Sequence, residues 1–185
     1  MKLTIIGAAG SIGAPTAFYT ALRNVVEEIK MIDPNAKLLK NHVMDMEQAV
    51  REKSDTRITA ADYSDLGDCD ILMITAAKPS SNVSSRDEWM TGNLQLLSRI
   101  QQDIGKYASN KIRISATNPS DVCTYYHYKN LGWDRSKIIG FCVNDSVRVR
   151  WALAIVMGLD YKEIDALCIG EHGPKQVPLW DKVTY

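Results

Sequence analysis

The sequence predicts an α/β fold built around one doubly wound parallel sheet, with a smaller unit after it. Short apolar runs alternate with longer helix-like segments, which is the rhythm of parallel strands joined by helices. Several runs, such as Ile71-Leu72-Met73-Ile74, are continuously apolar and therefore indicate strands that are covered on both faces. A glycine-rich turn also follows the first apolar run directly, where a strand passes into a helix.

Six apolar runs are predicted to be the strands of this sheet. They lie at residues 3–6, 29–32, 57–60, 70–76, 112–116 and 137–140. Proline and glycine mark helix ends: one helix is expected to begin near Pro15, and another to begin at Pro119 and end at Gly132.

The rhythm changes after Gly140. A helix is predicted over residues 145–157, followed by a strand over 166–169 that leads into Gly170-Glu171-His172-Gly173. We place the domain boundary near residue 141, so that 1–141 form the first domain and 142–185 begin a second. Because an ordinary domain needs at least about 50 residues, we expect this second domain to be incomplete.

Charge and composition exclude some partners. Among the 185 residues, Lys and Arg number 22 and Asp and Glu number 22, so no net charge attracts nucleic acid or an anionic membrane. No leader-like or membrane-spanning apolar stretch is expected. The four cysteines are widely spaced without a CxxC pair, and we expect reduced thiols in a cytoplasmic protein. No metal site is expected.

The glycine-rich turn predicts a dinucleotide site of the Rossmann type. Its residues are Gly7-Ala8-Ala9-Gly10-Ser11-Ile12-Gly13, between the first strand and a helix. Glycines let a pyrophosphate approach the N–H groups of the helix N-terminus. Ala8 stands where the common pattern has its first glycine, and a helix-entry turn without ligand is the alternative.

Asp33 strengthens the dinucleotide interpretation. It follows the second strand twenty positions after Gly13, where a carboxylate accepts hydrogen bonds from the adenosine ribose hydroxyls. The same charge repels a 2′-phosphate, so NAD is favoured over NADP. Alternatively, Asp33 is a solvated residue of the Asp33-Pro34-Asn35 turn.

Nearly the whole chain resembles the lactate and malate dehydrogenase family. The strongest element is Gly170-Glu171-His172-Gly173, and by this resemblance His172 is the catalytic acid–base. The segment 144–150 resembles the family's Asp-Ser-x-Arg-x-Arg stretch, which implies that Asp145 orients His172 and that Arg148 grips the substrate carboxylate. Asp145 also fits the pattern of a helix N-cap, and the two interpretations are compatible. His42 and His127 are expected to be structural.

The segment from Thr75 to Asn93 resembles the family's lid over the active site. Arg86 matches the lid arginine that polarises the substrate carbonyl, and Thr75, Ala76 and Ala77 match cofactor contacts. Two positions depart from the family. Ser80 stands where malate dehydrogenases carry a second arginine and lactate dehydrogenases a glutamine, which weakens a malate assignment, and Ala77 replaces a usual glycine.

A further resemblance lies at residues 116–121, Ala-Thr-Asn-Pro-Ser-Asp. It implies that Ala116 and Asn118 contact the cofactor, that Asn118 also contacts substrate, and that Asn93 takes part from the preceding helix. The position after a parallel strand is where such sheets bind ligands.

The resemblance therefore implies hydride transfer between NAD and a small L-2-hydroxy or 2-keto acid, in a protein that forms dimers or tetramers. Two alternatives remain open. Tyr125 and Lys129 form the Tyr-x-x-x-Lys pair of short-chain dehydrogenases. Alternatively, the chain binds NAD without turning over substrate, because two domains of about 150 residues need roughly 300.

Overall fold

The fold is seen in a computed structural model that describes residues 1–79, 85–108 and 111–185. Its centre is a six-stranded sheet in the order β3-β2-β1-β4-β5-β6, in which every pair of neighbours is parallel. The strands are β1 (Lys2–Ile6), β2 (Glu28–Ile32), β3 (Arg57–Ala60), β4 (Ile71–Ile74), β5 (Ile112–Ser115) and β6 (Ile138–Gly140). The prediction of a doubly wound parallel sheet is confirmed.

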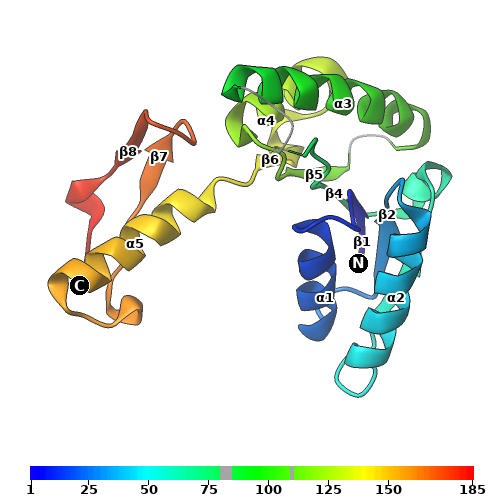
Figure 1. Ribbon diagram of the computed structural model, residues 1–185, viewed down its shortest axis with the longest axis horizontal. Helices are drawn as coiled ribbons and strands as arrows, with labels where there is room; N and C mark the ends of the chain where they lie inside the picture. The colour runs from blue at the N-terminus through cyan, green and yellow to red at the C-terminus, as the bar shows by residue number, and fades with distance from the viewer. Residues whose placement is uncertain (80–84, 109–110) are drawn as a thin grey trace.

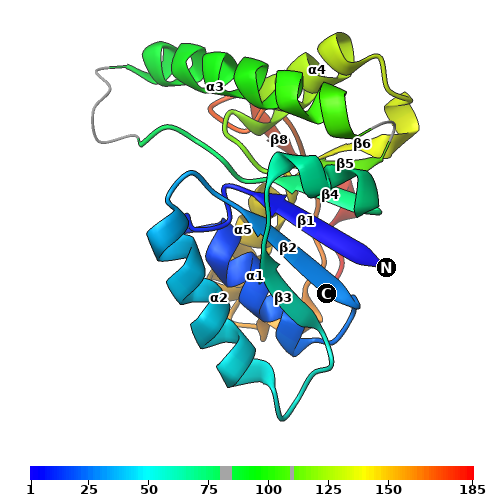
Figure 2. The ribbon, with the colours of Figure 1, turned by 90° about the vertical axis from the view of Figure 1, so that its right-hand side faces the viewer.

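Helices cover both faces of the sheet (Figures 1 and 2). One layer consists of α1 (Gly13–Leu22) and α2 (Ala36–Val50), and the other of α3 (Arg86–Tyr107) and α4 (Ser120–Leu131). A short 3₁₀ helix, η1 (Tyr63–Asp68), connects β3 to β4. The buried apolar residues form two clusters, one under each helix layer, so the inner strands are apolar on both sides.

Local sequence signals explain the helix ends. Ser85 accepts a hydrogen bond from the backbone N–H of Glu88 and so caps α3, and Asn35 caps α2 in the same way through Leu38. Pro119 immediately precedes α4, and Gly132 ends it with φ of +65°. Some boundaries differ from those predicted: α1 begins at Gly13, two residues before Pro15, because its first turn is part of the glycine-rich turn.

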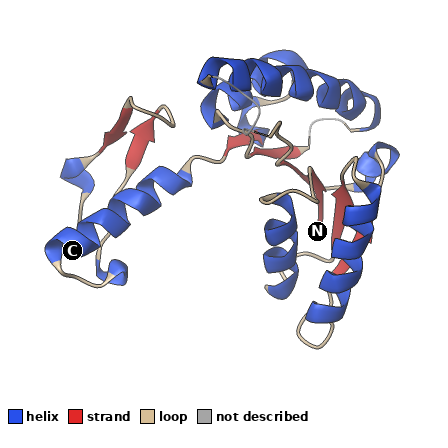
Figure 3. Ribbon diagram, viewed as in Figure 1, coloured by secondary structure: helices blue, strands red, loops and turns tan. Residues whose placement is uncertain are grey.

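The chain leaves the sheet after β6 and forms a smaller unit (Figures 1 and 3). Helix α5 (Val143–Met157) packs against the hairpin of β7 (Cys168–Gly170) and β8 (Gln176–Pro178), with short 3₁₀ helices η4 (Tyr161–Glu163) and η5 (Trp180–Lys182) at its connections. A further single-turn helix, η3 (Arg135–Lys137), precedes β6. Residue 141 lies between β6 and α5, and the domain division there stays a prediction.

The structure agrees with the prediction of unpaired cysteine thiols, and the cytoplasmic location stays a prediction. Cys69, Cys123, Cys142 and Cys168 are all free thiols, and only Cys142 is partly exposed. Within the described ranges, no helix combines the length and apolarity needed to cross a bilayer.

Candidate nucleotide-binding and catalytic site

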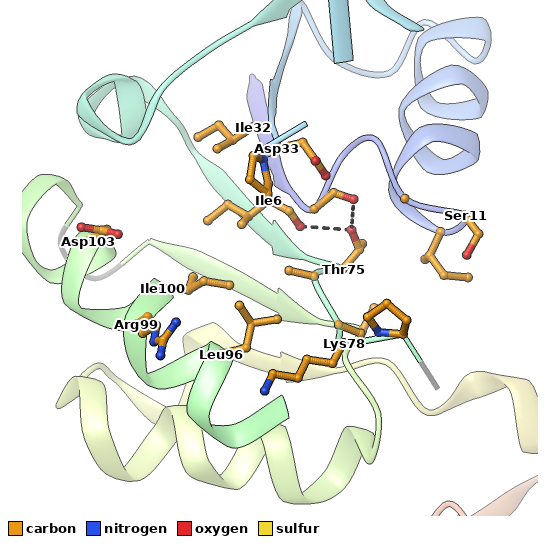
Figure 4. A pocket seen from close by; sticks show the side chains of 18 of the residues that line it. Ile6, Ser11, Ile32, Asp33, Thr75, Lys78, Leu96, Arg99, Ile100 and Asp103 are labelled. Atoms are coloured by element: carbon orange, nitrogen blue, oxygen red, sulfur yellow. Dashed lines mark hydrogen bonds between the residues drawn. The ribbon is translucent and has the colours of Figure 1, made fainter. Parts of the chain in front are cut away.

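The strand order reverses between β1 and β4, and the glycine-rich turn lies at this point. In open parallel sheets such a reversal opens a crevice at the carboxyl ends of the strands. Gly7 has φ of +84°, a conformation that favours glycine, and its N–H donates to the carbonyl oxygen of Ile32. The hydroxyl of Thr75, just after β4, lies 3.0 Å from the carbonyl oxygens of both Ile6 and Gly7 and fixes the turn (Figure 4).

Two glycines of this turn leave no room for a side chain. A Cβ on Gly7 would lie 2.5 Å from the backbone nitrogen of Ala76. A Cβ on Gly13 would collide with the carbonyl oxygen of Gly7 and lie 2.8 Å from the Thr75 hydroxyl. Helix α1 therefore starts in direct contact with the residues that follow β1 and β4. The methyl group of Ala8, which replaces the usual first glycine, is fully buried in the core and does not open the turn.

Asp33 connects the end of β2 to the glycine-rich turn. Its Oδ2 accepts a hydrogen bond of 3.1 Å from the N–H of Ala9, and its Oδ1 accepts one of 2.9 Å from the N–H of Asn35. Asp33 thus closes the local turn of residues 33–35 and also contacts the glycine-rich turn, so the two interpretations of this residue are compatible. Each carboxylate oxygen has a second lone pair with which to accept a ligand hydroxyl.

A cavity of about 820 Å³ opens at this edge of the sheet. It receives residues from the ends of β1, β2, β4 and β5 and from the inward face of α3 (Figure 4). Most of the residues predicted to contact a cofactor line it. They are Gly7, Gly10, Ser11, Ile12, Asp33, Thr75, Ala76, Ala77, Ala116 and Asn118. Ala9, Gly13 and Asn93 do not line it, and their part in binding a cofactor stays a prediction.

Asn93 is buried on α3 and joins two loops at the cavity. Its Oδ1 accepts a hydrogen bond of 2.7 Å from the N–H of Lys78, and its Nδ2 donates one of 2.8 Å to the carbonyl oxygen of Asn118. The indole N–H of Trp89 donates to the carbonyl oxygen of Lys78, which adds a second tie between α3 and the same loop. A buried amide with both ends bonded holds the loops after β4 and β5 in a fixed relation.

The predicted lid is described only in part. Ser80 lies outside the described residues, so the interpretation of this position as a substrate contact stays a prediction. Arg86 is the first residue of α3, and its side chain also lies outside the described part of the structure.

His172 and Asp145 are brought together in the smaller unit. Nδ1 of His172 lies 2.7 Å from Oδ2 of Asp145, and their side chains are 23% and 9% exposed. Asp145 is the third residue of α5, and Cys142 occupies the N-cap, so the interpretation of Asp145 as the cap is wrong. The helix begins earlier than predicted, which places the carboxylate in the first turn, where the helix dipole favours negative charge.

Arg148 lies one turn after Asp145 on α5. Its Nη1 is 3.4 Å from Oδ1 of Asp145, and its side chain is 68% exposed. The carboxylate of Asp145 thus contacts the imidazole through one oxygen and the guanidinium through the other. Most of the Arg148 fork faces outward, so it has donors left for an external carboxylate.

Local contacts hold the His172 loop on α5. The hydroxyl of Ser146 accepts a hydrogen bond of 2.9 Å from the N–H of Cys168, which fixes the start of β7 against the helix. Gly170 ends β7 with φ of +92° and turns the chain toward His172. None of His172, Asp145 and Arg148 lines the cavity; the three form a group separate from it.

The sequence interpretation missed the cavity wall formed by α3. Leu96, Arg99, Ile100 and Asp103 line the cavity and recur at helical spacing, so they share one face of α3. Tyr63 of η1 also lines the cavity, and burial together with the charges of Asp103 and Asp33 raises its pKa to about 12. A helix face with two apolar residues is the ordinary pattern of a core, so the sequence did not single it out.

Tyr125 and Lys129 lie on α4 and do not line the cavity. Nζ of Lys129 is 5.6 Å from the centre of the Tyr125 ring, and the tyrosine side chain is largely exposed. Nothing in their placement connects this pair to the glycine-rich turn.

The fold and the cavity together define a dinucleotide-binding α/β domain of the Rossmann type. Residues 1–140 match the family described as lactate/malate dehydrogenase, NAD binding domain. The chain belongs to this family.

The individual relatives include lactate dehydrogenases and malate dehydrogenases. A probable L-lactate dehydrogenase of Schizosaccharomyces pombe is 33% identical over 185 residues, which are 100% of this chain and 56% of that protein. A structure of the Cryptosporidium parvum lactate dehydrogenase complexed with lactic acid and nicotinamide adenine dinucleotide matches with a TM-score of 0.91 and 28% identity, over 99% of this chain and 58% of the other. The malate dehydrogenase of Aeropyrum pernix matches with a TM-score of 0.91 and 28% identity, over 98% and 59%. The chain thus spans less than two thirds of these relatives.

Proposed function

We propose that this chain binds NAD in the cavity at the glycine-rich turn. The N–H groups at the start of α1 bind the pyrophosphate, and Asp33 accepts hydrogen bonds from the adenosine ribose. The lack of space for a side chain at Gly7 and Gly13 supports this, because it keeps the start of α1 close to the turn that lines the cavity. Asn118, Ala116 and Thr75 lie toward the nicotinamide side at the ends of β5 and β4.

We further propose that the chain supplies the reacting groups of an NAD-dependent dehydrogenase for small 2-hydroxy acids. Bound NAD supplies the hydride acceptor. His172 takes the hydroxyl proton at Nε2, and Asp145 holds the ring so that Nδ1 carries the ring proton. Arg148 binds the substrate carboxylate, and Arg86 and Asn118 bind the reacting oxygen.

The observation that carries this proposal is the contact of 2.7 Å between His172 and Asp145. A carboxylate bonded to one imidazole nitrogen fixes the tautomer and stabilises the imidazolium form that proton uptake creates. The two residues are 27 positions apart in the sequence, and the pairing needs the hairpin of β7 and β8 to fold back on α5.

The residue at position 80 indicates which class of 2-hydroxy acid is preferred as substrate. With serine there, a second substrate carboxylate would have no arginine partner, which favours monocarboxylates over malate. Lys78 lines the cavity and is the described cation nearest to this segment in sequence.

A second candidate is NAD binding without turnover by these 185 residues alone. It is favoured by the separation of the His172 group from the cavity lining and by the 56% coverage of the Schizosaccharomyces relative. We expect dehydrogenase activity from a polypeptide of the relatives' length. For such a protein we also propose a cytoplasmic location and a homo-oligomer. Exposed apolar side chains on α5, including Trp151 at 62% and Val156 at 83%, support burial against further protein.

Titration of the chain with NADH, followed by nucleotide fluorescence, tests the binding proposal. We expect saturable binding, weakened about tenfold in Asp33→Asn, and an affinity for NADPH at least tenfold lower than for NADH. Glu52→Gln, an exposed carboxylate in the turn after α2, is the matched control and should bind NADH normally. Absence of saturable NADH binding would refute the proposal.

Turnover is tested by NADH oxidation with pyruvate, oxaloacetate and 2-ketoisocaproate. The 185-residue chain should show little or none, whereas the same chain extended to the relatives' length should be active and His172→Asn should abolish that activity. Loss of activity in Tyr125→Phe with retention in His172→Asn would favour the short-chain mechanism instead.

A further inference from the structure

The cavity continues past Asp33 to a polar rim on α3. Figure 4 shows Ser11 at one end of the view, Asp103 and Arg99 at the other, and Asp33 between them. The proposed function places the adenosine ribose at Asp33 and the pyrophosphate near Ser11. The adenine base therefore extends from Asp33 toward the rim formed by Arg99 and Asp103.

The walls at this end are suited to a flat ring. Ile32 and Ala61 come from the ends of β2 and β3, and Leu96 and Ile100 face them from α3. Ile32 and Ile100 are only 5% exposed. Apolar surfaces on both sides bury the faces of a base and leave its polar edge to meet the rim.

The rim offers a matched donor and acceptor. Arg99 and Asp103 are four residues apart on α3, so their side chains project from successive turns of one helix face. A guanidinium only donates hydrogen bonds, and a carboxylate only accepts them. The edge of adenine presents an amino donor beside a ring-nitrogen acceptor. The two sets are complementary.

We propose that Arg99 and Asp103 recognise the adenine base of the dinucleotide. Asp103 accepts a hydrogen bond from the exocyclic amine, and Arg99 donates one to the neighbouring ring nitrogen. This inference rests on the proposed NAD binding and adds base selectivity to it. Hypoxanthine carries an oxygen in place of the amine, which would face the Asp103 carboxylate and be repelled.

Asp103 also has a partner on its own helix. Its Oδ1 lies 3.3 Å from Nζ of Lys106, with side-chain exposures of 40% and 63%. A surface pair of this kind adds little stability. Asp103 and Tyr63 of η1 both line the cavity, and the charge of Asp103 is, after burial, a cause of the raised pKa of the tyrosine, which is consistent with a carboxylate near the cavity.

The test compares NADH with reduced nicotinamide hypoxanthine dinucleotide, whose nicotinamide signal is the same. Fluorescence titration of the whole 185-residue chain should show NADH binding about tenfold more tightly. Asp103→Asn, in which an amide can donate to the hypoxanthine oxygen, should bring the ratio of the two dissociation constants close to one. Arg99→Met should weaken NADH binding several-fold.

Lys106→Met is the control for a purely structural role of Asp103. If Asp103 acts only through its ion pair, Lys106→Met will reduce the selectivity as Asp103→Asn does; we expect it to keep the tenfold ratio. Equal affinities for the two dinucleotides in the unmodified chain, or full selectivity in Asp103→Asn, overturn this inference while NAD binding stands. Failure of both dinucleotides to bind overturns the proposed function itself.

Discussion

Nη2 of Arg113 on β5 lies 2.9 Å from Nε2 of His127 on α4, and both side chains are completely buried. Because arginine only donates, Nε2 accepts and the ring proton is on Nδ1. Nε2 of Gln101 on α3 lies 2.9 Å from Nδ1, and a flip of this amide would bring its oxygen there to accept the hydrogen bond from the ring. A neutral imidazole thus links three elements under the second helix layer.

This arrangement makes the stability of the protein dependent on pH. Burial, and then the charge of Arg113, lower the pKa of His127 from 6.5 to about 2. Below pH 6.5 the unfolded chain takes up a proton that the folded chain does not, so stability is lost as the pH falls from 6.5 toward 2.

We expect this residue to contribute a loss of about 1.4 kcal/mol per pH unit in that window. Urea unfolding at pH 7, 6 and 5 measures the slope, and His127→Gln should have a shallower one. Equal slopes in the two proteins would contradict the assignment.

Burial of the Arg113 guanidinium lowers the stability of the folded chain. Its Nε and Nη1 have no hydrogen-bond partner in the described part of the chain, and burial lowers its pKa to about 9. Replacing a poorly paired buried charge by an apolar side chain of similar length is favourable. Arg113→Met should therefore raise the free energy of unfolding by about 1 kcal/mol after the loss of the bond to His127. Arg113→Lys keeps the charge and should not stabilise; a destabilised Arg113→Met would refute the prediction.

The surroundings of Gly7 in the glycine-rich turn and of Gly105 on α3 predict opposite effects of a substitution by alanine. Gly7→Ala forces a methyl group against the backbone of Ala76 at φ of +84° and should destabilise by about 2–5 kcal/mol. Gly105→Ala on α3 meets nothing within 4 Å and should stabilise by about 1 kcal/mol. Thermal unfolding followed by circular dichroism measures both, and a neutral Gly7→Ala would show that the turn relaxes.

The contact between His172 and Asp145 predicts a fixed tautomer. Ring ¹⁵N chemical shifts of His172 at neutral pH should report a proton on Nδ1, and Asp145→Ala should redistribute it toward Nε2. Arg148→Ala is the matched control, because the contact of 2.7 Å does not involve the guanidinium. An unchanged spectrum in Asp145→Ala would remove the assigned role of Asp145.

Much of the sheet could be predicted from the sequence, because continuous apolar runs leave a strand little alternative to burial on both faces. The prediction for residues 70–76 was too long: β4 ends at Ile74, where the chain leaves the sheet so that Thr75 can bond the glycine-rich turn. Helix α5 begins two residues before Asp145, since apolar periodicity cannot locate a first turn made of Val143 and Asn144.

Site residues that belong to a local sequence motif could be predicted from the sequence. Site residues that only the packing of the fold brings together could not. Asp33 and the glycines follow from their spacing. Arg99 and Asp103 do not, because two charged residues on a long helix ordinarily indicate a solvated face. His127 was predicted to be structural, but its pairing with Arg113 depends on the spatial neighbourhood of β5 and α4, which no sequence spacing encodes.

The side-chain amide of Asn93 forms hydrogen bonds with the backbone of both Lys78 and Asn118. Trp89 bonds Lys78 from the same helix, so a displacement of α3 would strain hydrogen bonds to the loop after β4 and to the loop after β5 at once. The positions of these two loops at the edge of the cavity are therefore coupled through α3.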